Sequence, residues 1–295
     1  MNFLQSIYLD YYTIGSLIPV LFLFISAAMF YQIKDKSRST KVIANTLFAF
    51  GFFVLSYVVA STFYHPFAAF HRWSTVLFVL IVITLFMQAF FEFPEPKHTK
   101  LARILLRVML LLTFGFVGWF MAQTLEASFV YHFEGHYYDF DADEASYVIS
   151  VAIIGYITLL MGIGIWRISI TKGRERWTVL GILLGIMLSS FVPAYLNTLS
   201  REGGMDRGTF QVVFDLSIIV GLFVIVIIYL NNTNDKTTFM AKIILVSVVV
   251  FLLVLQAISY FAFIDKETAY DGIKSEQANR FRESGIEPEA MRYAV

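Results

Sequence analysis

Residues 210–230 read FQVVFDLSIIVGLFVIVIIYL, and Asp215 is the only charged side chain in this block. A helix needs about 20 apolar residues to cross the ~30 Å hydrocarbon core of a bilayer. Seven further blocks of this kind lie at residues 13–33, 42–64, 73–93, 103–124, 146–166, 177–199 and 241–264. Their polarity does not alternate, and backbone in lipid must satisfy its own hydrogen bonds, so helices are favoured over barrel strands. The sequence therefore predicts an all-α, polytopic membrane bundle of about eight spans.

The composition points to the same class of protein. Of the 295 residues, 58% are hydrophobic and 15% are charged, whereas soluble domains carry about 25% charged residues. This balance excludes a disordered chain, a nucleic-acid-binding protein and most soluble enzymes. The absence of cysteine also excludes disulfides, thiolate catalysis and iron–sulfur clusters.

Lysine and arginine are distributed unequally between the loops. The loops after the first, third, fifth and seventh blocks hold 14 basic residues, whereas the loops after the second, fourth and sixth blocks hold three. Because basic loops stay on the cytoplasmic side of a membrane, the N-terminus is predicted to lie outside. Eight spans return the chain to that side. The chain then divides into a sensor-type helical bundle at 1–264 and a polar external tail at 265–295, which is a candidate for the start of a truncated PAS- or Cache-like domain.

Four of the five histidines fall on the predicted outer side. Two of them flank the short turn after the second span, and two lie in an acidic loop at 125–145. Three interpretations stay open: interfacial side chains, a ligand-binding or proton-sensing pocket, or a site for a divalent metal ion built from a histidine pair and nearby carboxylates. The candidate metal ligands are His132, His136, Asp139 and Asp141.

Asp215 is the second feature that suggests a site, because a carboxylate within a span is costly and usually faces a cavity or a partner. The alternative is an interfacial acid that pairs for structural reasons. Gln88 and Gln256 are interpreted as interhelical hydrogen-bonding groups. The expected partners of the carboxylate are Arg201, Arg207, Asn197, His65 and His71.

The block at 177–199 has two features of its own. Gly181, Gly185 and Ser189 repeat at four-residue spacing, which lets another helix approach closely. Pro193 removes a backbone hydrogen bond and predicts a kink near the outer end of the helix.

Five motifs follow one another in an order that resembles a known family. They are YHP…HRW (64–73), VYHFEGHYYDFDA (130–142), WRI…TKGRERW (166–177), NTLSREG…DRGTF (197–210) and YLNNTNDKTTFMAK (229–242). The series is similar to the N-terminal seven- to eight-helix sensor region of spirochaete-type bacterial receptors, over about residues 1–264. The resemblance implies a bacterial inner-membrane protein that acts through homodimers. It also implies coupling to a SpoIIE-type phosphatase, nucleotide cyclase or histidine kinase output domain.

No output-domain motif occurs in this sequence, so the chain itself is not expected to be an enzyme. The leading hypothesis is a sensor or receptor module that binds a small ligand or ion near the outer helix ends. It would signal to a cytoplasmic output domain or a separate partner. The alternatives are a small-molecule or ion transporter and a membrane-embedded metal hydrolase. The candidate ligand-binding residues are His65, His71, His132, His136, Asn197, Asp206 and Asp215.

Overall fold

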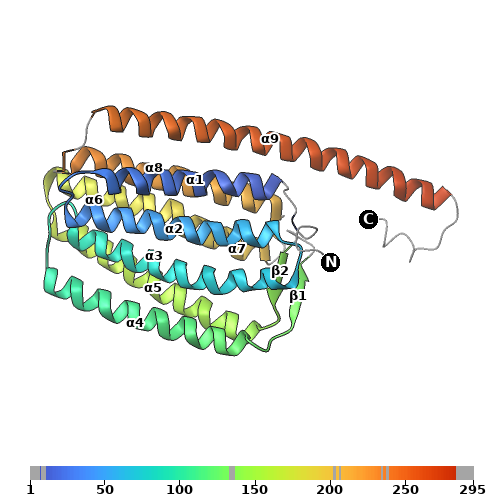
Figure 1. Ribbon diagram of the computed structural model, residues 1–295, viewed down its shortest axis with the longest axis horizontal. Helices are drawn as coiled ribbons and strands as arrows, with labels where there is room; N and C mark the ends of the chain where they lie inside the picture. The colour runs from blue at the N-terminus through green and yellow to red at the C-terminus, as the bar shows by residue number, and fades with distance from the viewer. Residues whose placement is uncertain are drawn as a thin grey trace.

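The computed structural model describes residues 7, 11–132, 137–201, 204–205, 207–233, 235–236 and 239–283. Its long elements are α1 (Tyr11–Gln32), α2 (Arg38–Thr62), α3 (His71–Glu92), α4 (Thr99–Thr124), α5 (Asp143–Ile170), α6 (Gly173–Ile186), α7 (Val192–Arg201), α8 (Arg207–Asn232) and α9 (Phe239–Glu283). Shorter elements are the 3₁₀ helix η2 (Pro66–Phe70), the π-helical turn η3 (Met187–Phe191) and the antiparallel hairpin of β1 (Phe129–His132) and β2 (Tyr137–Phe140). The helices lie side by side along one long axis (Figure 1).

The prediction of an all-α, multi-pass membrane bundle is confirmed. Within the described residues, eight helical segments are long and apolar enough to cross a membrane: Thr13–Gln32, Arg38–Thr62, Pro66–Glu92, Thr99–Thr124, Asp143–Ile170, Gly173–Ser200, Thr209–Asn232 and Lys242–Lys266. The third segment starts earlier than the sequence predicts, because η2 runs directly into α3. The sixth joins α6, η3 and α7 into one span.

The bundle has two distinct ends. The hairpin end carries β1, β2, η2 and α7, and the opposite, basic end carries the turns that precede α2, α4 and α6 (Figure 1). At the basic end the buried carboxylate of Glu92 pairs with Arg38 at 2.9 Å. Arg167, which is fully buried, donates to the backbone oxygen of Glu95 at 2.6 Å. Each of these buried charged side chains thus has a polar contact, although the Nε and Nη1 atoms of Arg167 find no partner among the described residues.

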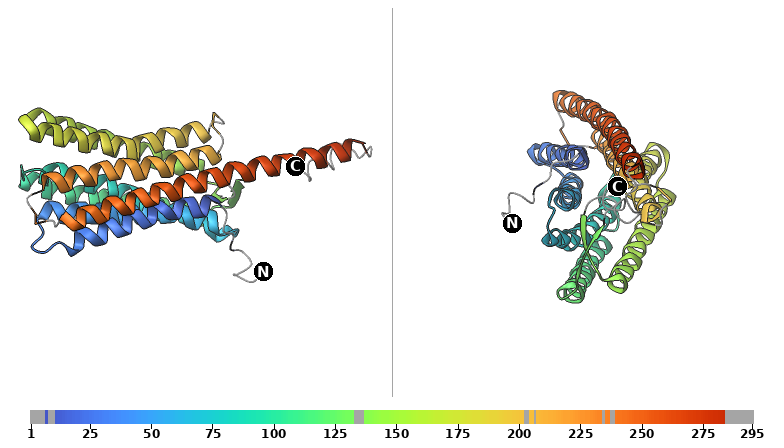
Figure 2. Two further views of the ribbon diagram at one scale, coloured as in Figure 1. Left: turned by 90° about the horizontal axis from the view of Figure 1, so that it is seen from above. Right: turned by 90° about the vertical axis from the view of Figure 1, so that its right-hand side faces the viewer.

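The helices differ in how much apolar surface they leave uncovered. Side chains of α1, α3 and α8 fill the interior, and Phe22, Leu80 and Leu222 are fully buried. By contrast, Leu111 on α4 and Phe261 on α9 are 74% and 68% exposed, as expected for helix faces that meet lipid. Helix α9 runs along the outside of the bundle and projects past the hairpin end (Figures 1 and 2). The tail predicted at 265–295 therefore begins as a continuation of α9, up to Glu283.

The close approach predicted from the small residues of span six is confirmed. A Cβ atom added at Gly185 would lie 2.9 Å from the backbone oxygen of Gly221 on α8. One added at Gly221 would lie 2.7 Å from the backbone nitrogen of Ser189. Regular α-helical bonding is also interrupted at η3, directly before Pro193: the Val192 N–H donates to the Met187 oxygen, five residues back. Span six is thus in backbone contact with α8 at the point where it is irregular.

The predicted orientation can be tested with single cysteines, because the chain has none of its own. We expect an impermeant maleimide to label Asp143→Cys, at the hairpin end, in intact spheroplasts. We expect Lys172→Cys, at the basic end, to react only after permeabilisation, because positively charged loops stay inside. The reverse labelling pattern would contradict the predicted orientation.

Candidate functional site

A cavity of about 240 Å³ lies in the hairpin-end half of the bundle, between α2, α3, α5, α7 and α8. It opens to the outside of the bundle along α5 and α7, where the lining residues Ile154 and Thr198 are exposed. Most of its wall is apolar, as is usual for small-molecule sites. The apolar lining includes Phe50, Phe53, Val79, Ile83, Ile153, Ile157 and Phe214.

Polar side chains of the wall gather toward the hairpin end. Their chemistry is one guanidinium, several hydroxyls and one amide, and they come from segments far apart in the sequence. They are Tyr57, Arg72, Thr75, Ser146, Ser150, Asn197 and Thr198. Ser189 and Ser190, from the irregular turn η3, also reach the wall. A molecule in the cavity would therefore meet an apolar body and a polar end that contains one guanidinium.

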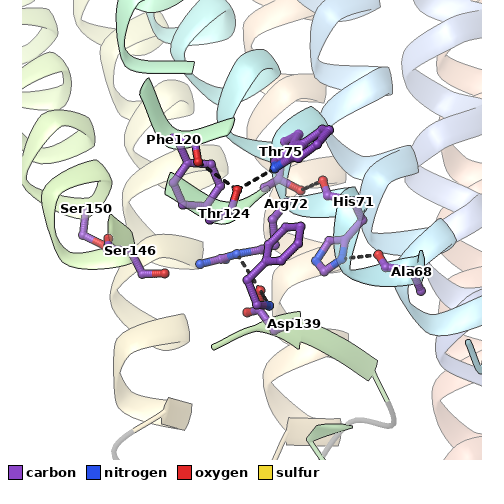
Figure 3. A network of polar contacts seen from close by, with 11 residues as sticks. Ala68, His71, Arg72, Thr75, Phe120, Thr124, Asp139, Ser146 and Ser150 are labelled. Atoms are coloured by element: carbon purple, nitrogen blue, oxygen red, sulfur yellow. Dashed lines mark hydrogen bonds and ion pairs between the residues drawn. The ribbon is translucent and has the colours of Figure 1, made fainter. Parts of the chain in front are cut away.

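The positive charge is that of Arg72, which forms an ion pair with Asp139 of β2. The Nε–Oδ1 distance is 3.2 Å, and the two side chains are only 16% and 10% exposed. Asp139 Oδ1 also accepts the backbone N–H of Phe140 at 2.9 Å. In Figure 3 the far end of the guanidinium points toward Ser146 on α5. Within the described residues, the polar contacts of Arg72 end at Asp139, so its terminal Nη groups remain available to a ligand.

Aromatic packing holds the hairpin over this end of the bundle. Phe140 of β2 packs edge-on against Phe70 of η2, with ring centroids 5.4 Å apart, and stacks on Trp73 of α3 at 6.0 Å. Trp73 Nε1 donates to Thr124 Oγ1 at 2.8 Å, which ties α3 to the end of α4. The hairpin is therefore anchored by apolar contacts and by the Arg72–Asp139 pair together.

A tyrosine cluster lies on the hairpin beside Tyr64. The Tyr131 ring is 5.1 Å from the Tyr64 ring, and the Tyr138 ring is 5.7 Å from it. Burial raises the pKa of Tyr131 and of Tyr138, and the neighbouring tyrosines raise both pKa values further. These phenols therefore stay neutral at physiological pH and act as hydrogen-bonding and packing groups.

The histidines predicted to form a pocket take separate positions. The Nδ1 of His65 accepts the Phe67 N–H at 3.2 Å and caps η2. His71 is buried, and its Nδ1 bonds to the Ala68 oxygen at 2.8 Å (Figure 3). His132 is exposed and stacks on Tyr137 at 4.9 Å. None of these three histidines lines the cavity, whereas the predicted residue Asn197 does.

The predicted metal ligands are only partly described. Asp139 is engaged by Arg72, and Asp141 accepts from Ser128 Oγ at 3.1 Å. The described residues contain no group of three or more His, Asp or Glu side chains that would hold a metal ion. His136, like Asp206 of the predicted ligand site, lies outside the described residues. The metal site stays a prediction.

Asp215 is buried, but it faces away from the cavity that its neighbour Phe214 lines. Its carboxylate accepts from Ser16 at 3.1 Å and from Gln211 at 3.4 Å. Neither partner was expected from the sequence. The interhelical hydrogen bond expected for Gln88 is not formed to any described residue, and the Oε1 atom of Gln256 also has no partner among them.

Sequence reasoning missed Arg72, Ser146 and Ser150 as members of the site. The available signal was the charge pattern, because Arg72 is the one basic residue in the turn between spans two and three, on the side that basic residues avoid. No family model and no curated protein matches this chain. The assignment of function therefore depends on the cavity and its charge.

Proposed function

We propose that this chain is a membrane receptor module that binds a small amphipathic anion in the cavity at the hairpin end. The observation that carries the proposal is the placement of Arg72, a poorly exposed cation at the polar end of a largely apolar cavity. A guanidinium binds carboxylate or phosphate through two parallel N–H donors. The hydroxyls of Ser146 and Ser150 lie on the same wall and would complete the contacts to the anion.

The cavity also borders the element best suited to respond to a ligand. Ser189 and Ser190 of η3, and Pro193 just beyond it, line the cavity directly. π-helical turns are rare, and they occur frequently at functional sites. A ligand that prefers one arrangement of this turn would shift the balance between two arrangements of span six against α8.

The output of this module would lie at the basic end. The positive-inside pattern supports a cytoplasmic location for that end. The resemblance to bacterial sensor regions suggests the class of partner: an output domain or a separate signalling protein. Residues of η3 and α7 line the cavity, and α6, which belongs to the same span, extends from them to the basic end (Figure 1). A shift of span six would therefore change its contacts with a partner bound at the basic end.

Ligand binding can be tested with matched amphiphiles on the purified protein. We expect medium-chain carboxylates or alkyl phosphates to raise the unfolding temperature saturably, and alcohols and amines of equal chain length to have little effect. Arg72→Gln should weaken anion binding at least about tenfold, which corresponds to roughly 1.4 kcal/mol. Arg103→Gln, which removes an exposed arginine at the basic end, is the matched control.

A second variant separates loss of binding from loss of fold. Val79→Phe would place a ring in the cavity without removing a charge, so we expect it to block binding as well. The proposal is wrong if anions stabilise Val79→Phe and Arg72→Gln as strongly as the unaltered protein.

The conformational response can be measured with a pair of spin labels. Tyr147 on α5 and Tyr195 on α7 are 71% and 62% exposed, and no native cysteine competes for labelling at these positions. We expect a stabilising anion to shift the Tyr147→Cys to Tyr195→Cys distance by about 1–2 Å, the scale of helix shifts in signalling transitions. An unchanged distance at saturating ligand would favour a binding protein that does not signal.

A transporter is the second candidate, and the interrupted helix of span six favours it, because discontinuous helices often form transport sites. The observation against it is that most of the polar groups of the cavity gather at one end. Uptake of the same anions into proteoliposomes, compared with liposomes that lack the protein, discriminates the two functions.

A further inference from the structure

A second polar site is buried between α1, α8 and α9, apart from the cavity. Its centre is the Asp215 carboxylate, which is 1% exposed and lies six residues inside the span Thr209–Asn232. Ser16 of α1 donates to Asp215 Oδ2 at 3.1 Å, and Gln211 donates to Ser16 Oγ at 2.7 Å. These partners are neutral, so within the described residues the negative charge has no counter-ion.

The amide of Gln256 faces the same place. Gln256 of α9 is 3% exposed, and its Oε1 has no hydrogen-bond partner among the described residues. A Cβ atom added at Gly15 would lie 3.6 Å from Gln256 Nε2, 3.6 Å from Asp215 Oδ2 and 3.5 Å from Ser259 Oγ. Side chains from α8 and α9 therefore converge on one small space against the bare backbone of α1.

The chemistry of this space is that of a hard cation site. Carboxylate, hydroxyl and amide oxygens are the ligands that such cations take in proteins. Rotation of the Gln256 amide by 180° exchanges its nitrogen for its unpartnered oxygen. One carboxylate supplies one negative charge, so a monovalent ion leaves the site neutral, whereas a divalent ion would leave a net charge buried in the membrane. We propose that Asp215, Gln256, Ser16 and Ser259 bind a sodium ion beside Gly15.

The site would control how α9 docks. Helix α9 exposes much of its apolar surface, including Val254 and Ile258 on either side of Gln256. Gln256 and Ser259 are the polar groups with which it approaches Asp215 and Gly15. A sodium ion shared between them would hold α9 against α1 and α8, whereas loss of the ion would leave a buried carboxylate facing an unpartnered amide. This role does not depend on the anion proposed for the cavity.

The experiment is thermal unfolding of the purified full chain in sodium, potassium or choline chloride at equal ionic strength and pH 8. We expect a saturable rise of a few degrees that is specific to sodium, as for any ligand that binds only the folded state. Gly15→Ala is the decisive variant, because the added methyl would make ordinary van der Waals contacts at 3.5–3.6 Å while it fills the ion's space. We expect Gly15→Ala to fold and to lose the sodium response.

The amide offers a matched pair of variants. Gln256→Leu should also lose the sodium response, whereas Gln88→Leu should keep it, since Gln88 is an equally buried and unpartnered amide with no role in this site. An equal rise with potassium or choline, or an undiminished sodium response in Gly15→Ala, would overturn the proposal. Stabilisation by acid alone, with no effect of sodium, would show that Asp215 holds a proton instead.

Discussion

Replacing Arg72 by methionine is expected to lower the free energy of unfolding by about 3–5 kcal/mol, because it leaves the Asp139 carboxylate buried without its partner. The Asp139 side chain is only 10% exposed, so water cannot replace the lost guanidinium without opening the hairpin. Methionine keeps much of the aliphatic volume, so the loss reports the charge more than the packing. The measurement is thermal or denaturant unfolding of the purified protein.

A double-mutant cycle gives this prediction its control. We expect Arg72→Met combined with Asp139→Leu to recover most of the lost stability, since an apolar pair of similar volume is often as stable as a buried ion pair. Arg280→Met removes an exposed pair with Glu276 on α9, whose side chains are 76% and 65% exposed, and should change stability little. If both single variants at the hairpin are as mild as Arg280→Met, the pair does not hold the hairpin closed.

The spans were predictable because membrane helices obey a local rule. An apolar block of the right length must hydrogen-bond to itself, whatever it packs against. The block quoted at 210–230 is the clearest case, and it lies within the span Thr209–Asn232. The close contact of span six with α8 followed from the spacing of Gly181, Gly185 and Ser189, because small residues have a steric consequence that does not depend on the partner.

The cavity was not predictable in the same way, because it is made by contacts between distant segments. Arg72 lies in the first turn of α3, Asp139 lies on β2, and Ser146 lies in the first turns of α5. What brings them together is the packing of α5 on α3 and of β2 on η2, together with the register of the hairpin, in which Val130 opposes Asp139 and Tyr131 opposes Tyr138. Composition and spacing within one segment carry no information about that register.

Asp215 was predictable in part: its burial could be predicted from the sequence, but its partners could not. A carboxylate within an apolar span is easily recognised in the sequence, so we could expect it to be buried. Its partners could not be predicted, because the charged and polar residues near the helix ends were the more obvious candidates. The structure supplies Ser16, Gly15 and Gln256 from α1 and α9. Neutral small and amide residues are common in membrane helices, so only the fold shows which of them meet.

Gly221→Ala is expected to lower the unfolding temperature by roughly 6–12 °C, or about 3 kcal/mol, the upper range of ordinary overpacking. The added Cβ would lie 2.7 Å from the Gly185 oxygen and 2.7 Å from the Ser189 nitrogen. Both are backbone atoms, so no side-chain rotation relieves the clash, and α8 and span six must separate at η3. Because Ser189 also lines the cavity, the same substitution should weaken binding of the proposed anion.

Gly118→Ala and Gly155→Ala are the matched controls, because a Cβ atom at either position meets nothing within 4 Å. All three substitutions gain the same helix propensity, about 1 kcal/mol relative to glycine, so the difference between them isolates the packing of α8 on span six. We expect the two controls to be neutral or slightly stabilising. A Gly221→Ala protein as stable as Gly118→Ala would mean that the two helices can move apart at no cost, and that the irregular turn beside the cavity is not held by α8.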